Sequence, residues 1–165
     1  NYKSFKYTVK KVLKRKDKIL DYKKTNIEGW NRFENAEGIP LNRPPWGILT
    51  AIDLKNKKIL WKIPHGSYEK LKDKGFEQNT GSEIFGSPVI TSGGVIFIAG
   101  TDDRMIRGYD LYSGEKIWQD KLPFSSYGSL IIASYKSIDY LVVNSSSGSK
   151  FDSERGDSII IYQLN

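Results

Sequence analysis

Short apolar runs separated by turn residues dominate the stretch Glu83–Trp118. The runs are rich in β-branched and aromatic side chains and are bounded by Gly, Asp and Ser, a pattern typical of strands joined by tight turns. No window of this stretch sustains a helical period. The pattern predicts four antiparallel strands, at Pro88–Thr91, Val95–Ala99, Arg104–Leu111 and Glu115–Lys121.

Part of this predicted sheet recurs elsewhere in the chain. The segment Ala51–Trp61 repeats Gly108–Trp118 in its small first residue, its Asp, its turn and its final Trp, at an offset of 57 residues. A shortened copy, Asp157–Asn165, closes the sequence. Repeats of this kind, each a four-stranded unit, predict the blades of a β-propeller. We expect each Asp to accept hydrogen bonds from the turn that follows it, and each Trp to pack on the neighbouring blade and donate its N–H there.

The predicted fold class is therefore all-β, a partial β-propeller of about two to three four-stranded antiparallel blades. Residues 1–63 are expected to form a partial blade with a basic N-terminal hairpin, residues 83–121 a complete blade, and residues 128–165 an incomplete final blade, all within one propeller domain. Partial blades leave sheet faces and edges unpaired, and the first residue is Asn. We therefore expect the C-terminal piece of a longer protein; a small β-domain that closes in another way is the alternative.

The longer connections are expected to gather on one face of the propeller. In a four-stranded blade, the loop after the outer strand and the loop between the second and third strands emerge on the same side. The long connections are Asn31–Trp46, Ile63–Ser82, Leu122–Tyr127 and Asn144–Gly156, whereas the opposite turns, such as Ser92–Gly94 and Tyr112–Gly114, are short. Rigid scaffolds usually carry their binding groups on such loops.

Positive charge is concentrated at the start of the chain. Residues 1–24 contain ten Lys and Arg but two Asp, a net charge of +8, whereas the whole chain has +7. Such an arm could bind nucleic acid or an anionic membrane. The spacing of Tyr2, Phe5, Tyr7 and Val9 instead favours a Lys-rich exposed hairpin, and we expect no nucleic-acid partner. The chain contains no cysteine, so it has no disulfide, metal-thiolate site or thiol nucleophile.

The repeat also resembles a known family. The spacing small-x-Asp-x-x-(Thr/Ser)-Gly-x-x-x-Trp is similar to the tryptophan-docking motif of quinoprotein dehydrogenases, which use pyrroloquinoline quinone (PQQ). The docking residues here are Ala51, Asp53, Trp61, Gly108, Asp110, Gly114 and Trp118. Longer strings follow the family's order and resemble the C-terminal end of the membrane-bound glucose dehydrogenase type; they are Gly29–Phe33, Arg43–Gly47, Phe85–Gly94 and Gly156-Asp157. The resemblance covers roughly Gly29 to Asn165.

The resemblance implies an eight-bladed propeller and an enzyme that oxidises sugar or polyol alcohols by hydride transfer to PQQ, with calcium as a Lewis acid. The residues implied to lie next to the cofactor are Phe85, Gly86, Ser87, Ser149 and Lys150. Trp46 is either a packing anchor or a wall of the substrate pocket. The calcium ligands and the catalytic residues are expected outside this segment, so the isolated fragment should be inactive.

The resemblance further implies a periplasmic protein, with any membrane anchor upstream of this segment. The implied partners are the rest of the propeller, a small sugar or polyol, and a quinone or cytochrome as electron acceptor. Two departures from the family's pattern bear on the cofactor: Ser87 replaces a Gly, and Ser145–Ser147 replaces a Gly-rich run. Serine adds bulk where the backbone approaches a ligand, so the cofactor could be shifted, its polar contacts altered, or the quinone lost. A non-catalytic propeller scaffold that shares only the docking motif is therefore the alternative function.

The remaining polar residues are expected to serve the fold rather than chemistry. Lys57 occupies a turn position that favours Gly, and a positive φ there would cost free energy. His65 is the only histidine in the chain; with no partner carboxylate evident, it is expected at the surface. The acidic groups at Asp102, Asp103, Asp152 and Glu154 are expected in turns or at the surface.

Overall fold

The computed structural model describes residues 6–8, 14–15, 18–19, 26–28, 33–72, 75, 80–147 and 154–164. The chain divides into two compact units, Asn1–Leu41 and Asn42–Asn165, which are described separately. The predicted partial blade at residues 1–63 straddles this division, so its assembly into one blade stays a prediction. No helix in the described ranges is long and apolar enough to cross a membrane.

The first unit contains the predicted N-terminal hairpin. Strand β1 (Lys6–Thr8) pairs antiparallel with β4 (Asn26–Glu28), and β2 (Lys14–Arg15) pairs with β3 (Lys18–Ile19). The second pair is nested within the first in sequence. The side chains of this hairpin lie outside the described part of the chain, so its exposure to solvent stays a prediction.

The second unit is built around the complete blade. Strands β7 (Val89–Ile90), β8 (Val95–Ile98), β9 (Met105–Asp110) and β10 (Lys116–Lys121) form an antiparallel sheet in the order β10-β9-β8-β7. This confirms the four strands predicted from the apolar runs, although each is shorter than its run. Consecutive strands pair as antiparallel neighbours because each connection is short, whereas parallel neighbours need a long crossover.

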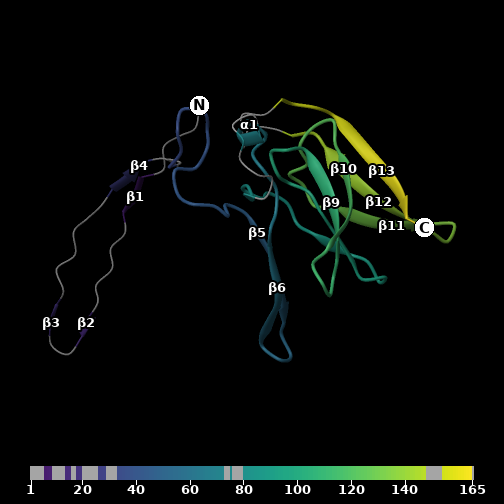
Figure 1. Cartoon of the computed structure of the whole chain (residues 1–165), viewed down its shortest axis with the longest axis horizontal. Coiled ribbons are helices and arrows are strands. Elements are labelled where there is room, and N and C mark those ends of the chain that lie inside the picture. Colours follow the sequence, from purple (N-terminus) through teal and green to yellow (C-terminus); the bar gives the residue numbers. More distant parts are fainter. Residues whose placement is uncertain are drawn as a thin grey trace. The chain divides into compact units, whose positions relative to one another are not determined.

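Incomplete sheets flank this blade on both sides in sequence (Figure 1). Strands β5 (Ile48–Asp53) and β6 (Lys58–Pro64) form a two-stranded sheet that precedes the short helix α1 (Glu69–Lys72). Strands β11 (Ile131–Tyr135), β12 (Ile138–Ser145) and β13 (Ser158–Leu164) form a three-stranded sheet in that order. The fold is thus all-β, as predicted, and in sequence the four-stranded sheet stands between this two-stranded and this three-stranded sheet.

The repeat in sequence is also a repeat in strand register. Trp61 lies opposite Ala51, and the β5–β6 register shifts by one residue immediately afterwards. Trp118 lies opposite Gly108, and the β9–β10 register shifts at the same place. A bulge of this kind leaves one residue unpaired and increases the local twist. Two copies with the same irregularity are therefore structurally equivalent, which identifies β5–β6 as the outer half of a blade.

The turn after each repeated Asp is held by the Asp side chain. Asp53 accepts hydrogen bonds from the backbone N–H of Asn56 (3.0 Å) and from its side-chain amide (2.6 Å). Asp110 accepts from the backbone N–H groups of Tyr112 (3.0 Å) and Ser113 (2.7 Å). These bonds confirm the predicted role of the Asp, and they lower the pKa of both carboxyl groups because they favour the ionised form. Lys57 has a φ of 54°, the positive value that its turn position predicts.

The core lies on both faces of β8. One face contributes Phe97 and Ala99 to a cluster with residues of the final sheet, including Leu141 and Val143, which are fully buried. The other face contributes Ile96 and Ile98 to a cluster with residues of the β5–β6 sheet. Alternating side chains of β8 therefore pack against both neighbouring sheets. Each Å² of apolar surface that this packing removes from water stabilises the fold by roughly 25 cal/mol.

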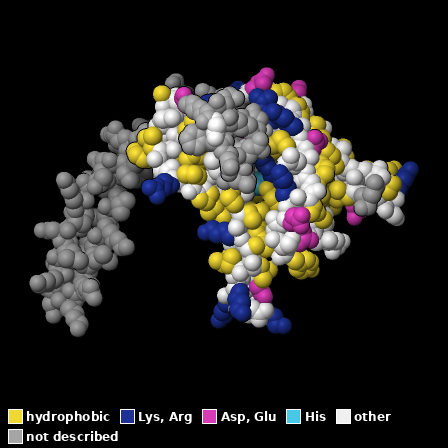
Figure 2. Space-filling view, in the orientation of Figure 1, with side chains coloured by type: hydrophobic (Ala, Val, Ile, Leu, Met, Phe, Trp, Pro, Cys, Tyr) yellow, Lys and Arg dark blue, Asp and Glu magenta, His cyan; other side chains and the backbone are white. Residues whose placement is uncertain are grey.

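The outward face of the β5–β6 hairpin is apolar and exposed. Ile52, Leu54 and Ile59 are each more than half exposed, and Figure 2 shows hydrophobic side chains along this hairpin, with Lys and Arg side chains at its free end. An exposed apolar face on half a blade indicates that further strands or another blade cover it. The opposite face packs on the complete blade.

A Trp from one sheet contacts the turn of the next. Trp61 donates its Nε1–H to the backbone carbonyl of Leu111 (3.0 Å), and its ring lies so close to Gly114 that a Cβ there would stand 2.7 Å from Cδ2. Trp118 packs differently. Its ring meets Phe97 edge to face at 5.7 Å and Tyr162 of the final sheet at 5.1 Å.

Candidate functional site

Two aromatic–Gly–Ser steps stand at the starts of neighbouring sheets. Phe85-Gly86-Ser87 precedes β7, and Tyr127-Gly128-Ser129 precedes β11. Each step leads into the first strand of its blade, which in a propeller is the strand nearest the axis. The second step repeats the first at an offset of 42 residues. We did not predict the second step, although the repeated aromatic–Gly–Ser triplet was a signal that could have revealed it.

The structure brings the two steps into contact. The rings of Phe85 and Tyr127 meet edge to face, with centroids 6.0 Å apart and planes at 77°. Gly86 has a φ of 116°, and a Cβ on it would stand 2.9 Å from the carbonyl oxygen of Gly128. Only glycine adopts this backbone without strain. The glycine of the first step is therefore required by the approach of the second.

The first step is also fixed from behind by the loop between β8 and β9. The backbone N–H of Phe85 donates to the carbonyl of Gly100 (2.8 Å). Gly100 has a φ of 93°, and a Cβ on it would overlap the carbonyl of Phe85 at 1.6 Å. Phe85 is half-buried, whereas Gly86 and Ser87 are exposed. The step is thus a rigid edge that presents backbone and hydroxyl groups on one side.

Serine hydroxyls gather behind the second step. Ser125 and Ser126 are each 1% exposed, and within the described ranges neither hydroxyl has a hydrogen-bond partner; the same holds for the buried hydroxyl of Ser147. The backbone N–H of Ser147 donates to the carbonyl of Ser125 (2.8 Å), so the three side chains belong to one region. Ser145, in contrast, is satisfied by the backbone N–H and carbonyl of Phe124 (3.0 and 2.7 Å). Buried hydroxyls without partners are uncommon and indicate a polar group or water that completes them.

The structure tests the placement of the other predicted site residues only in part. Ser149 and Lys150 lie outside the described residues, so their predicted place beside the cofactor stays a prediction. Trp46 donates its Nε1–H to the carbonyl of Asn42 (2.9 Å), and its ring meets Tyr68 edge to face at 5.4 Å. Its backbone N–H donates to the carbonyl of Thr80 (2.8 Å). These contacts are compatible with a packing anchor, and the pocket-wall role of Trp46 stays a prediction.

The prediction that His65 lies at the surface is wrong. His65 is fully buried (0% exposed), and its Nδ1 is 3.0 Å from the hydroxyl of Tyr109. Its backbone N–H donates to the carbonyl of Gly47, and its carbonyl accepts from the backbone N–H of Ser82. The loops can cross this closely because residue 47 is glycine: a Cβ there would stand 1.8 Å from the Ser82 carbonyl oxygen. Burial, and then the nearby charge of Arg107, lower the pKa of His65 to about 4, so its imidazole is neutral at pH 7.

Asp103 occupies a turn, as expected, and it is buried (2% exposed), which the sequence did not indicate. It forms an ion pair with Arg107 and accepts hydrogen bonds from Thr101 (2.6 Å), Ser67 (3.0 Å) and the backbone N–H of Met105 (3.1 Å). Burial alone would raise the pKa of Asp103, but the hydrogen bond and charge of Arg107 outweigh it and lower the pKa. Every strong partner of this carboxylate is thus internal, which makes it a structural group rather than a free base.

Two of the other acidic groups that the sequence singled out are Glu154 and Asp152. Glu154 is exposed and pairs with Arg104 at 3.5 Å, as expected for a surface residue, and Asp152 lies outside the described residues. Within the ranges that the structure describes, no three His, Cys, Asp or Glu side chains lie close enough together to hold a metal ion.

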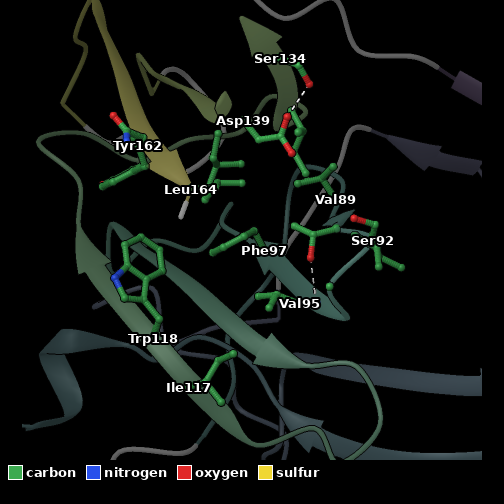
Figure 3. Close-up of a pocket in the computed structure, with 16 residues that line it drawn as sticks. Val89, Ser92, Val95, Phe97, Ile117, Trp118, Ser134, Asp139, Tyr162 and Leu164 are labelled. Atoms are coloured by element: carbon green, nitrogen blue, oxygen red, sulfur yellow. Dashed lines mark hydrogen bonds between the residues drawn. The ribbon is translucent and has the colours of Figure 1, made fainter. Parts of the chain in front are cut away.

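A cavity of about 890 Å³ lies between the complete blade and the final sheet, at the opposite end of the strands from the aromatic–Gly–Ser steps. Figure 3 shows Trp118, Tyr162 and Phe97 around it, with Ser92 of the β7–β8 turn and Asp139 of β12 at its polar side. The Asp139 carboxylate is engaged by the hydroxyl of Ser134. The cavity is a gap in the seam between two blades and contains no arrangement of catalytic groups.

The comparisons of this chain with known protein sequences agree on one family. The family model for the β-propeller domain of glucose/ethanol/alcohol dehydrogenases, named PQQ, matches residues 3–140. The chain is 38% identical over 139 residues to a probable quinate dehydrogenase (quinone) of Xanthomonas campestris pv. juglandis, covering 81% of this chain and 18% of that protein. It is 32% identical over 138 residues to the quinoprotein glucose dehydrogenase of Escherichia coli (strain K12), covering 81% of this chain and 17% of that protein.

Two solved structures also match over part of the chain. One is a europium-containing methanol dehydrogenase (TM-score 0.44, 23% identity, 58% of this chain and 14% of that one). The other is the quinohemoprotein alcohol dehydrogenase ADHIIG of Pseudomonas putida HK5 (TM-score 0.48, 18% identity, 61% and 12%). The chain spans less than a fifth of the length of the relatives and structures that it matches here.

Proposed function

Because the chain belongs to the family of PQQ-type glucose/ethanol/alcohol dehydrogenase β-propellers, we propose that it is part of a PQQ-dependent dehydrogenase that oxidises a small polyhydroxylated alcohol. In this proposal the aromatic–Gly–Ser steps before β7 and β11 form part of the wall that holds the quinone. The observation that carries it is the contact between these two steps, at the starts of the strands nearest the axis.

The residues present are compatible with a planar cofactor that has carbonyl and carboxylate oxygens. Phe85 and Tyr127 offer aromatic surface, and aromatic side chains favour flat partners. The exposed backbone at Gly128, where an added Cβ would meet no atom within 4 Å, leaves room for close approach. Within the described part of the chain, the buried hydroxyls of Ser125, Ser126 and Ser147 have no hydrogen-bond partner and lie behind the second step. When bound, PQQ would accept two electrons as hydride from the alcohol carbon.

The part of the chain described here would bind and orient rather than transfer protons. The Phe85–Gly100 backbone hydrogen bond holds the first step in place (2.8 Å). The Asp103–Arg107 pair and the buried His65 stiffen the adjacent loops without offering a free base. Pre-organised edges of this kind contribute to catalysis by positioning a bound group. We therefore propose that the proton-abstracting carboxylate and the calcium ligands come from the remainder of the protein, and that this segment alone is inactive.

The proposed substrate class follows from the hydroxyl groups that the relatives' substrates share. The names of the relatives specify quinate, glucose and, for the glycerol dehydrogenase large subunit of Gluconobacter oxydans (strain 621H), glycerol. All three compounds carry several hydroxyl groups. We propose a sugar or other polyol as substrate, a quinone or cytochrome as electron acceptor, and a periplasmic location for the whole protein.

The test is reconstitution of the full-length protein with PQQ and calcium, followed by a dye-reduction assay with glucose, quinate and glycerol. Quinone binding together with dye reduction by at least one polyol is the expected result. A protein that neither binds PQQ nor reduces dye would instead be a propeller scaffold that shares the family's fold without its chemistry.

A further inference from the structure

The step Tyr127-Gly128-Ser129 resembles Phe85-Gly86-Ser87 in sequence and in its place before the first strand of a sheet. Both precede the first strand of their sheet, and both combine a half-buried ring with an exposed glycine and an exposed serine. The edge-to-face contact of the two rings and the approach of Gly86 to the Gly128 carbonyl make them one continuous surface. A ligand that touches the first step therefore meets the second.

The two glycines differ in a way that points to where a ligand would lie. At Gly86 a Cβ would meet the backbone of the second step at 2.9 Å, so the space there is filled by protein. At Gly128 no atom lies within 4 Å of an added Cβ, and the residue has no positive φ. Glycine at this position is therefore not required by the fold of the described residues. An unfilled space beside a conformationally ordinary glycine is the space that a bound group can occupy.

Polar groups border the same position. Ser129 is exposed directly after Gly128, and the buried hydroxyls of Ser125 and Ser126 lie directly before Tyr127. The backbone bond from Ser147 to Ser125 links this segment to the loop after β12. A ring, an open backbone and the exposed Ser129 at one edge match the chemistry of a flat ligand whose rim carries oxygen atoms.

We propose that Tyr127-Gly128-Ser129 forms a second quinone-binding step, in which the Tyr127 ring positions Phe85 and the open side of Gly128 receives the edge of the cofactor. This inference rests on the proposed function, because it assigns a role toward PQQ. It goes further by assigning specific residues that the resemblance did not indicate. Tyr127 acts here through Phe85 and is a positioning residue, whereas Gly128 and Ser129 face the ligand.

Titration of the full-length apoprotein with PQQ, followed by tryptophan fluorescence and by equilibrium dialysis, tests the proposal without relying on activity. Gly128→Val fills the open space without backbone strain, so its melting temperature should stay within about 2 °C of wild type. The same variant should weaken PQQ binding at least about tenfold, because the side chain occupies the ligand's volume. Gly93→Val is the matched control, since a Cβ at Gly93 also meets nothing closer than 3.8 Å but lies in the β7–β8 turn at the far end of the strands. That control should bind PQQ as wild type does.

A second pair of variants separates the ring from the hydroxyl. Tyr127→Leu should weaken PQQ binding about three- to tenfold, since an aromatic pair contributes about 0.5–1.5 kcal/mol. Tyr127→Phe keeps the ring and should stay within about twofold of wild type. Tyr135→Leu, at the exposed end of β11 (63% exposed), should have no effect.

The outcomes distinguish the two proposals. If wild-type protein binds PQQ and both Gly128→Val and Tyr127→Leu bind it equally well, the second step has no role toward the cofactor, while the proposed function stands. If the wild-type protein binds no PQQ under conditions where it is folded, the proposed function and this inference both fail. Weaker binding by Gly128→Val at an unchanged melting temperature supports the inference directly.

Discussion

Gly114→Ala tests the contact between the β5–β6 sheet and the turn of the complete blade. Gly114 has a φ of 74°, and an added Cβ would stand 2.7, 2.9 and 3.0 Å from Cδ2, Cε3 and Cγ of Trp61. The ring cannot easily withdraw, because its Nε1–H is bonded to the carbonyl of Leu111 at 3.0 Å. The substitution thus combines backbone strain with a steric clash at one position.

The free-energy cost of the backbone strain and that of the steric clash can be estimated separately. A positive φ costs an L-residue about 1–2 kcal/mol, and overpacking against a fixed neighbour costs about 1–3 kcal/mol. Gly114→Ala should therefore lower the free energy of unfolding by about 2–5 kcal/mol. Gly94→Ala is the control, since Gly94 has a similar φ of 80° but its Cβ would meet only the Tyr112 ring, at 3.4 Å. It should cost about 1–2 kcal/mol, the strain alone.

Urea unfolding followed by far-ultraviolet circular dichroism measures these differences in the full-length protein. Adding Trp61→Ala removes the clash, so Gly114→Ala should cost only about 1–2 kcal/mol in that background, and the two substitutions should be non-additive. Equal losses for Gly114→Ala and Gly94→Ala, together with additivity toward Trp61→Ala, would show that the Trp61 ring does not press on Gly114 and would refute the account of the contact.

Three further predictions concern the buried polar groups and the final sheet. The pKa of His65 falls from 6.5 to about 4 on folding. The contribution of the neutral imidazole to stability is therefore complete above pH 6.5 and is lost as the pH falls through 4. His65→Leu should reduce the loss of unfolding free energy between pH 7 and pH 4, measured by urea unfolding, by about 3 kcal/mol. Asp103→Asn leaves Arg107 buried without its counter-ion and should destabilise by about 3–5 kcal/mol at pH 7 in the same assay, and a change below 1 kcal/mol would contradict a buried pair. Tyr162→Phe removes one exposed hydrogen bond, to Asp120 (2.8 Å), and should cost less than about 1 kcal/mol in thermal melts, whereas Tyr162→Ala also removes the ring from Trp118 and should cost about 3 kcal/mol.

Much of the fold was predictable because the signals that define it are local. The strands of the complete blade follow from short apolar runs between turn residues, and the Asp110 turn is closed by bonds that span only two or three residues. Lys57 has the positive φ that its turn position predicted. Such features depend on neighbours in sequence, so a repeated pattern predicts a repeated structure.

The error concerns a residue whose surroundings come from distant segments. His65 is buried because the loops carrying Gly47 and Ser82 cross over it and Tyr109 reaches its ring from another sheet. A polar loop sequence does not indicate which loops will be covered. Asp103 was correctly assigned to a turn, but its hydrogen bond with Ser67, which is 36 residues away, was not predictable from neighbouring residues.

By itself, the sequence determined that the chain is a set of tandem antiparallel sheets with Asp-held turns, because hydrogen bonds within a few residues and a two-residue side-chain period are written directly in residue order. Only the tertiary structure decided that the Phe85 and Tyr127 steps touch, that Gly86 is sterically required while Gly128 is open, and that the sole histidine is neutral in the interior. These properties arise from packing between sheets, where exclusion of water and the approach of backbones are set by atoms far apart in the chain.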